Sequence, residues 1–152
     1  MITPSNRSIW FQTSSLERTR ASYQGTAISH LGIELIEIGA DFIKARMPVD
    51  HRTIQPVGLL HGGASVLLAE TLGSLAAGLC VDPHVFSCVG LEINANHIRG
   101  VRSGWVIGTA RPAHIGRSTH IWEIRIEDEQ QRLVCLSRLT VAVLALDRFG
   151  SA

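Results

Sequence analysis

The stretch that decides the fold reads GGASVLLAETLGSLAAGLC and covers Gly62–Cys80. It contains no proline and a single charged side chain, Glu70. On a helix, residues spaced three or four apart share one face, and four leucines form such a stripe, which a sheet would cover. The stripe consists of Leu68, Leu72, Leu75 and Leu79. A helix with apolar or small residues on nearly every face is normally buried all round. We therefore expect one long core helix.

Glu70 is the unusual residue of this helix, because an unpaired charge is unfavourable in a protein core. Gly73, Ser74 and Ala77 are small and lie on the same side, so they would leave space beside the carboxylate. A catalytic role is one reason to keep a carboxylate there. An ion pair with a buried arginine is an equally common reason.

Length and composition indicate one globular domain over residues 1–152, with residues 1–31 as an N-terminal helical extension. The net charge of +1 gives no case for nucleic acid or a membrane surface as a partner. The scattered cysteines Cys80, Cys88 and Cys135 argue against a zinc site or a disulfide framework. The first residues lack the apolar run of a signal peptide, and glycines, serines and Glu70 argue against a membrane-spanning core helix. We expect a cytoplasmic protein.

The remaining elements follow from periodicity and turn residues. Two short helical pieces are expected within residues 14–30, the first capped by Ser14 or Ser15. Residues 32–49 read as a hairpin, in which the alternation slips at Leu35-Ile36 and indicates a bulge or a strand covered on both faces. Four more strand-like runs follow the helix, at 84–98, 104–113, 118–128 and 132–146. This order predicts an α+β fold, a curved antiparallel sheet wrapped around one long central helix.

The strand-like run at residues 118–128 has the clearest alternation. His120, Trp122, Ile124 and Ile126 share one face, which we expect to be buried. The opposite face is largely polar.

The start of the core helix is a candidate binding site for an acyl oxygen. The first N–H groups of a helix have no partner within it and carry the positive end of the dipole, and glycines at 62 and 63 allow a ligand close approach. Glu70 is then a candidate nucleophile or general base. Gly62 and Glu70 are eight residues apart, roughly 12 Å along a helix, too far to meet at one carbonyl carbon. A two-fold dimer with antiparallel core helices would bring them together twice.

Neighbouring polar residues could assist this chemistry. Ser74 lies one turn beyond Glu70 and could hold a water or orient the carboxylate. Gln55 and His61 offer hydrogen-bond donors near the helix entrance. Arg99 follows the expected strand at residues 84–98, and Arg117 precedes the one at residues 118–128. Both could pair with phosphates. Taken singly, each of these residues is also explained as a turn, core or surface residue. Ser65 after His61-Gly62-Gly63 suggests a serine hydrolase, but the chain has no G-x-S-x-G and is too short for that fold.

The segment from Gln55 through His61-Gly62-Gly63 to Glu70 and Ser74 resembles the signature of hotdog-fold acyl-CoA thioesterases, in the branch of the 4-hydroxybenzoyl-CoA and phenylacetate-pathway enzymes. Residues 89–97, VGLEINANH, and 114–117, HIGR, are similar to 1,4-dihydroxy-2-naphthoyl-CoA hydrolases of menaquinone synthesis and to enterobactin proofreading thioesterases. The resemblance runs from about Gly32 to Leu146 and implies the hotdog fold.

The resemblance also implies roles for individual residues. Glu70 would attack the thioester or activate water, Gly62 would bind the carbonyl oxygen through its N–H, and Ser74 would assist hydrolysis. Gln55 and His61 would position the acyl group. Coenzyme A would be held by residues of two segments: Val89, Asn96, His97, Ile98 and Arg99, and then Ala113, His114, Ile115, Gly116, Arg117 and Ser118.

The expected function is hydrolysis of aromatic, hydroxylated aryl acyl-CoA thioesters, without metal or cofactor, since coenzyme A is part of the substrate. The expected assembly is at least a homodimer, with a homotetramer as a dimer of dimers. The alternatives are a proofreading thioesterase acting on aryl carrier-protein thioesters, a dehydratase of the same fold, and a non-catalytic acyl-CoA-binding protein.

Overall fold

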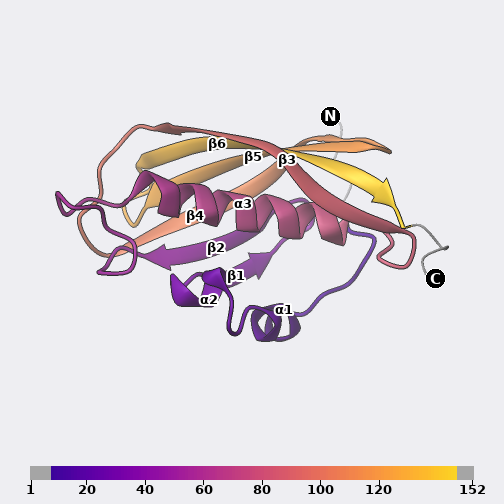
Figure 1. The fold of residues 1–152 in the computed structure, drawn as a ribbon, viewed down its shortest axis with the longest axis horizontal. Coiled ribbons are helices and arrows are strands. Elements are labelled where there is room, and N and C mark those ends of the chain that lie inside the picture. The colour runs from indigo at the N-terminus through magenta and orange to yellow at the C-terminus, as the bar shows by residue number, and fades with distance from the viewer. Residues whose placement is uncertain (1–7, 147–152) are drawn as a thin grey trace, which may run out of the picture.

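The structure is a computed structural model that describes residues 8–146 (Figure 1). Its order confirms the expected sequence of two short helices, a hairpin, a long helix and four strands. Residues 1–7, part of the expected N-terminal extension, lie outside the described residues. The elements are α1 (Leu16–Ser22), α2 (Ala27–His30), β1 (Glu34–Ile38), β2 (Ile43–Pro48), α3 (Gly62–Leu79), β3 (Phe86–His97), β4 (Trp105–Ile115), β5 (Thr119–Asp128) and β6 (Leu133–Ala145).

The strands form one antiparallel sheet in the order β1-β2-β4-β5-β6-β3. The helix α3 runs along this sheet, which curves around it (Figure 1). The α+β architecture predicted from the sequence, a sheet wrapped around one long helix, is therefore confirmed. Strands β1 and β3 end the sheet, so each has one edge without a partner strand in the described chain.

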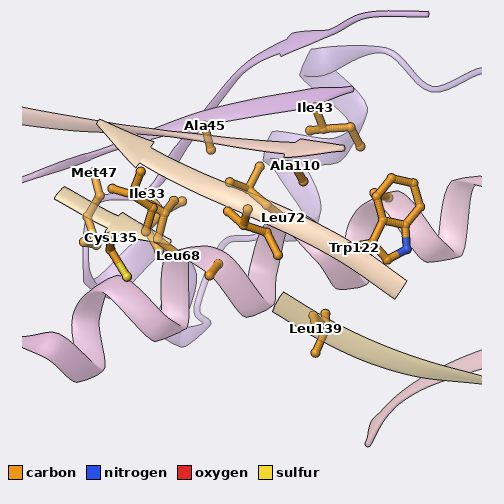
Figure 2. Packing of buried hydrophobic residues seen from close by; sticks show 14 of the residues in the cluster. Ile33, Ile43, Ala45, Met47, Leu68, Leu72, Ala110, Trp122, Cys135 and Leu139 are labelled. Atoms are coloured by element: carbon orange, nitrogen blue, oxygen red, sulfur yellow. The ribbon is translucent and has the colours of Figure 1, made fainter. Parts of the chain in front are cut away.

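The core lies between α3 and the concave face of the sheet. Leu68 and Leu72 are fully buried there, between α3 and the strands that carry Ala45 and Ala110 (Figure 2). The predicted alternation of β5 is confirmed, because its inward-facing side chains are almost completely buried. These side chains are His120, Trp122, Ile124 and Ile126.

The prediction that α3 is buried all round is wrong. Leu68, Leu72 and Leu79 are buried as expected, but Leu75 is only partly buried and packs at the margin of the core. A second face, which includes Glu70, is also only partly buried. The reason is that the sheet covers one side of the helix. The helix is long and apolar enough to span a membrane, yet in this fold it packs against the sheet.

Local features follow the sequence closely, with one difference. The slip at Leu35-Ile36 is a β-bulge between Leu35 and Glu37, and Ser15 caps α1 by accepting a hydrogen bond from Arg18 N–H. The strand expected at residues 104–113 ends later, because β4 continues to Ile115. The continued pairing of His114 and Ile115 with β5 accounts for this shift.

Candidate active site

The N-terminus of α3 is held in shape by His61. This residue has an extended backbone, and its Nδ1 accepts a hydrogen bond of 2.8 Å from Gly63 N–H. Its carbonyl accepts hydrogen bonds from the N–H groups of Ala64 and Ser65. The Gly62 N–H has no acceptor within residues 8–146. The helix therefore presents one free N–H at its positive end, and a neutral His61 carries its proton on the outer Nε2.

Gln55 lies in the loop before this helix, in a tight turn. Its carbonyl accepts a hydrogen bond from Gly58 N–H, and Gly58 has a φ of 76°, a conformation that favours glycine. The side-chain Oε1 of Gln55 accepts a hydrogen bond of 2.8 Å from Val57 N–H. Only the oxygen of the side-chain amide can accept a hydrogen bond from a backbone N–H, so this bond fixes the orientation of the amide. The two N–H groups of Gln55 Nε2 then remain as donors.

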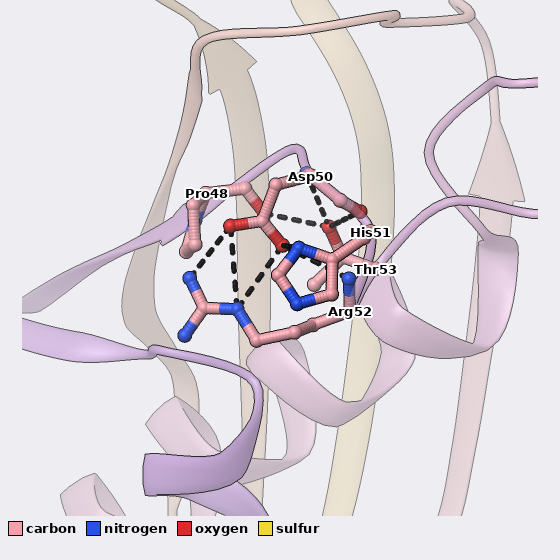
Figure 3. A network of polar contacts seen from close by, with 5 residues as sticks. All are labelled: Pro48, Asp50, His51, Arg52 and Thr53. Carbon is pink, nitrogen blue, oxygen red and sulfur yellow. Dashed lines mark hydrogen bonds and ion pairs between the residues drawn. The ribbon is translucent and has the colours of Figure 1, made fainter.

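A polar network fixes the start of the same loop (Figure 3). Thr53 Oγ1 donates to the Pro48 carbonyl at 2.7 Å and accepts from Asp50 N–H at 3.0 Å. The Thr53 carbonyl accepts a hydrogen bond from His61 N–H, which joins the network to α3. The side-chain hydrogen bonds that Arg52 donates to Asp50 lower the pKa of that carboxyl to about 2. The Asp50 carboxylate is therefore ionised at neutral pH. Through Thr53, the loop is held to Pro48 at its start and to His61 at its end.

A cleft of about 310 Å³ opens beside the helix N-terminus. Gly62 and Gln55 line it together with the end of β3, so two of the predicted catalytic residues meet part of the predicted coenzyme A segment. The His97 ring packs against Gly62, where an added Cβ would lie 2.8 Å from His97 Nε2. Gly62 thus makes room for an imidazole of the same chain. The lining residues are Gln55, Leu59, Leu60, Gly62, Ser65, His97, Ile98, Arg99, Gly100 and Val134.

Ser65 does not form a serine-hydrolase triad. The residue is 2% exposed, and its hydroxyl makes no hydrogen bond to a histidine ring in the part of the chain that the structure describes. Nor do three His, Cys, Asp or Glu residues come together as a candidate metal site in that part.

Glu70 lies on the partly buried face of α3, and Ser74 lies one turn further along. The Ser74 hydroxyl donates a hydrogen bond of 3.1 Å to Glu70 Oε1. Within residues 8–146, Glu70 forms no ion pair with an arginine or lysine, so this part of the chain contains no structural pair of Glu70 with a buried arginine. The residue is only partly buried, and the part of the sheet that approaches its carboxylate is the edge strand β3.

The expectation that Gly73 and Ala77 leave space beside Glu70 is also wrong. Both are buried against the sheet, and a Cβ on Gly73 would lie 2.6 Å from Leu139 Cδ2. Space beside the carboxylate comes instead from Gly90 in β3, a residue that the sequence analysis missed. The signal that could have found it is a glycine inside a strand-like run, which often marks a close approach.

One chain does not bring all predicted site residues together. Glu70 does not line the cleft that contains Gly62. The predicted coenzyme A segments also separate, because Ile115–Arg117 line a different pocket of about 260 Å³ beside Cys80–Asp82, at the C-terminal end of α3. The 18 residues of α3 span roughly 27 Å at 1.5 Å per residue, which sets the scale of this separation.

The outer edge of β3 passes close to Glu70. Val89 and Leu91 of this strand are 46% and 65% exposed, and the register shifts between Gly90 and Glu92. An edge strand with exposed apolar side chains is a ready surface for pairing with another chain.

Known proteins resemble this chain over most of its length. Residues 57–135 match the family model described as Thioesterase superfamily. The chain is 50% identical over 136 residues to the 1,4-dihydroxy-2-naphthoyl-CoA hydrolase of Escherichia coli, covering 90% of this chain and 99% of that protein. It is also 50% identical over 142 residues to the proofreading thioesterase EntH of Cronobacter turicensis, covering 90% and 98%.

Solved structures include the same fold. A crystal structure of a thioesterase from Haemophilus influenzae superimposes with a TM-score of 0.90 at 50% identity, covering 94% of this chain and 99% of that one. The hotdog fold inferred from the sequence resemblance is thereby confirmed.

Proposed function

We propose that this chain, which belongs to the thioesterase superfamily and is a thioester hydrolase, cleaves aromatic acyl-CoA thioesters at sites shared between two copies of itself. The observation that carries the proposal is the separation of two groups on one helix. The free Gly62 N–H lies at the start of α3, and Glu70 lies eight residues later beside an open sheet edge. A partner chain in antiparallel orientation would bring Glu70 of each chain to the Gly62 N–H of the other chain.

In the proposed site the thioester oxygen is bound by Gly62 N–H. The positive end of the α3 dipole favours the negative charge that develops on this oxygen. Gln55 Nε2 is a second donor in the same cleft, because its oxygen is already held by Val57. The outer Nε2–H of His61 is a third donor at the helix entrance.

Glu70 supplies the base or the nucleophile. As a base, it takes a proton from water, the oxygen attacks the carbonyl carbon, and the carbon–sulfur bond breaks to release the thiol and the acid. As a nucleophile, it forms an anhydride that water then hydrolyses. The hydrogen bond from Ser74 supports either route, because it fixes the carboxylate in one orientation.

The nucleotide part of coenzyme A would be held by segments of both chains. Asn96, His97, Ile98 and Arg99 lie at the end of β3 next to the cleft, and Val89 lies on the β3 edge. Residues 113–118 of the other chain would reach the same ligand. Arg99 and Arg117 are both exposed, and neither forms an ion pair within the described chain, so both are free to meet phosphates.

One named relative supports an aromatic acyl group, because the substrate in its name carries a dihydroxynaphthoyl group. A role in menaquinone synthesis is the corresponding proposal. The second candidate is proofreading of carrier-protein thioesters, which the other named relative supports. We propose a cofactor-free cytoplasmic enzyme, and the three free cysteines agree with a reducing compartment.

The test is a panel of aryl and alkyl acyl-CoA thioesters together with aryl thioesters of a carrier protein, ranked by kcat/KM. The proposal expects the hydroxylated aryl-CoA substrates to rank first. Higher kcat/KM for alkyl-CoA substrates would contradict the aromatic assignment, and higher values for the carrier-protein thioesters would favour the proofreading role.

A further inference from the structure

Gly90 is an unexpected residue in the middle of β3. Glycine in the interior of a strand weakens it, because the residue has no side chain to pack and loses much conformational freedom. Here it pairs with Val141 of β6, directly before the irregularity at Leu91. The position therefore needs a reason.

The backbone conformation does not supply that reason. Gly90 is absent from the residues with a positive φ, so an alanine could adopt the same backbone conformation. What separates glycine from alanine here is the space that a methyl group would fill.

That space is filled by the carboxylate of Glu70. A Cβ on Gly90 would lie 2.5 Å from Glu70 Oε1, 3.5 Å from its Cδ and 3.8 Å from its Oε2. All three nearest atoms belong to this one group, and non-bonded heavy atoms prefer separations of about 3.5–4.0 Å. A methyl group would thus displace the carboxylate.

We propose that Gly90 is a positioning residue for Glu70: its missing side chain lets the carboxylate rest against the edge strand β3, facing the substrate bound by the partner chain. This inference rests on the proposed function, in which Glu70 is the catalytic carboxylate. Ser74 Oγ holds the same Oε1 from the helix side. The carboxylate is therefore confined between a hydroxyl of α3 and the backbone of β3. Bulges next to active sites commonly re-aim a side chain, and the irregularity at Leu91 stands beside this contact.

The first test is Gly90→Ala. The atoms in the way end a flexible side chain, so the carboxylate moves and the fold remains. We expect unfolding temperature and dimerisation like the wild type, an unchanged KM, and a kcat lower by ten- to a hundredfold, which is the order expected for an ångström-scale misplacement. The matched control is Gly78→Ala on α3, where an added Cβ meets nothing within 4 Å. It should keep the wild-type kcat.

A double-mutant cycle tests the contact itself. Glu70→Asp shortens the side chain by one methylene and withdraws the carboxylate from Gly90. In that background Gly90→Ala should cause no further loss of kcat, whereas losses that multiply would overturn the inference. If Gly90→Ala is too unstable to assay, its destabilisation should vanish when combined with Glu70→Ala. An equal destabilisation in both backgrounds would also overturn it.

The failure of this inference is distinguishable from the failure of the proposed function. A wild-type kcat for Gly90→Ala, with an inactive Glu70→Gln, would overturn the role of Gly90 alone. A wild-type kcat for Glu70→Gln would overturn the proposed function and the inference together.

Discussion

Ser74 Oγ donates a 3.1 Å hydrogen bond to Glu70 Oε1 from one turn further along α3, on the partly buried face of the helix beside the edge strand β3. The two side chains belong to one short helical segment, so their geometry is set locally. The groups that would bind the substrate lie elsewhere, at the helix N-terminus. We therefore expect substitutions of Glu70 and Ser74 to act mainly on kcat.

Glu70→Gln should lower kcat by at least about a hundredfold, because the amide neither accepts a proton nor attacks a carbonyl at useful rates. Ser74→Ala should lower kcat by about tenfold, since it removes one neutral hydrogen bond but leaves the carboxylate. Steady-state kinetics on one aryl-CoA substrate checks both values. Ser22→Ala on α1 is the matched control and should behave as the wild type. A larger loss for Ser74→Ala than for Glu70→Gln would contradict the assigned roles.

The two routes for Glu70 are separable by a single turnover in heavy-oxygen water. General-base catalysis places the label in the released acid. An anhydride that water opens at the enzyme's carbonyl instead leaves label in the Glu70 carboxylate. Label in the peptide that contains Glu70, measured by mass spectrometry, therefore identifies the nucleophilic route, with unlabelled water as the control.

The network around Thr53 predicts a variant that affects both stability and activity. Thr53→Val keeps the size of a side chain that is 1% exposed but removes the hydroxyl that meets Pro48 and Asp50. Leaving such buried groups unpaired should lower the free energy of unfolding by about 1–3 kcal/mol. The Thr53 carbonyl accepts from His61 N–H, so a shift of this turn after loss of the hydroxyl should move the start of α3 and lower kcat/KM as well. Urea unfolding and kinetics test this, with Thr53→Ser as the control that retains the hydroxyl. Equal behaviour of the two variants would contradict it.

Asp50 gives a pH-dependent prediction with a definite sign. Its pKa is about 2 in the folded chain, lowered from 3.8 by the hydrogen bonds and charge of Arg52. A lowered pKa stabilises the fold above the unfolded-state value, and this contribution is lost as the pH falls from about 4 towards 2. Asp50→Asn should therefore be less stable than the wild type at pH 7, and the difference should shrink below pH 4. Urea unfolding across this range measures it, and a constant difference would contradict the assignment.

Much of this architecture could be predicted from the sequence because it depends on local periodicity. The alternation of β5 gave its buried face, and the slip at Leu35-Ile36 gave the bulge. The burial of α3 was overestimated because composition does not reveal which face a sheet will cover. The space beside Glu70 was assigned to helix neighbours such as Gly73, but it comes from Gly90, which lies twenty positions after Glu70 in the chain. Contacts of this kind depend on strand register, which a single sequence does not specify.

The open edge of β3 predicts that assembly can be disrupted at one position. Leu91→Glu adds a charge to an exposed apolar side chain on the strand that ends the sheet. We expect this variant to become monomeric in sedimentation velocity and to lose activity, although Glu70 and Gly62 are intact in every chain. Leu144→Glu is the matched control, since Leu144 is 48% exposed on β6, where it pairs with Ser87 of β3 and lies away from the open edge of the sheet. A monomeric and fully active Leu91→Glu would refute a site shared between chains.

Complementation between two inactive variants tests the shared site most directly. Glu70→Gln and Gln55→Ala each damage a different half of the site, so each homodimer has two defective sites. In a mixed dimer, the chain with Glu70→Gln supplies an intact Gln55, and its partner supplies an intact Glu70. One of the two sites is then wild type and the other carries both defects. Random mixing of equal amounts gives half mixed dimers, and activity should return to about a quarter of the wild-type value.

The control is a chain that carries both substitutions and is refolded alone, which should stay inactive. Refolding the mixture and measuring turnover per chain decides the matter, because a site contained within one chain would give no recovery above the two parents.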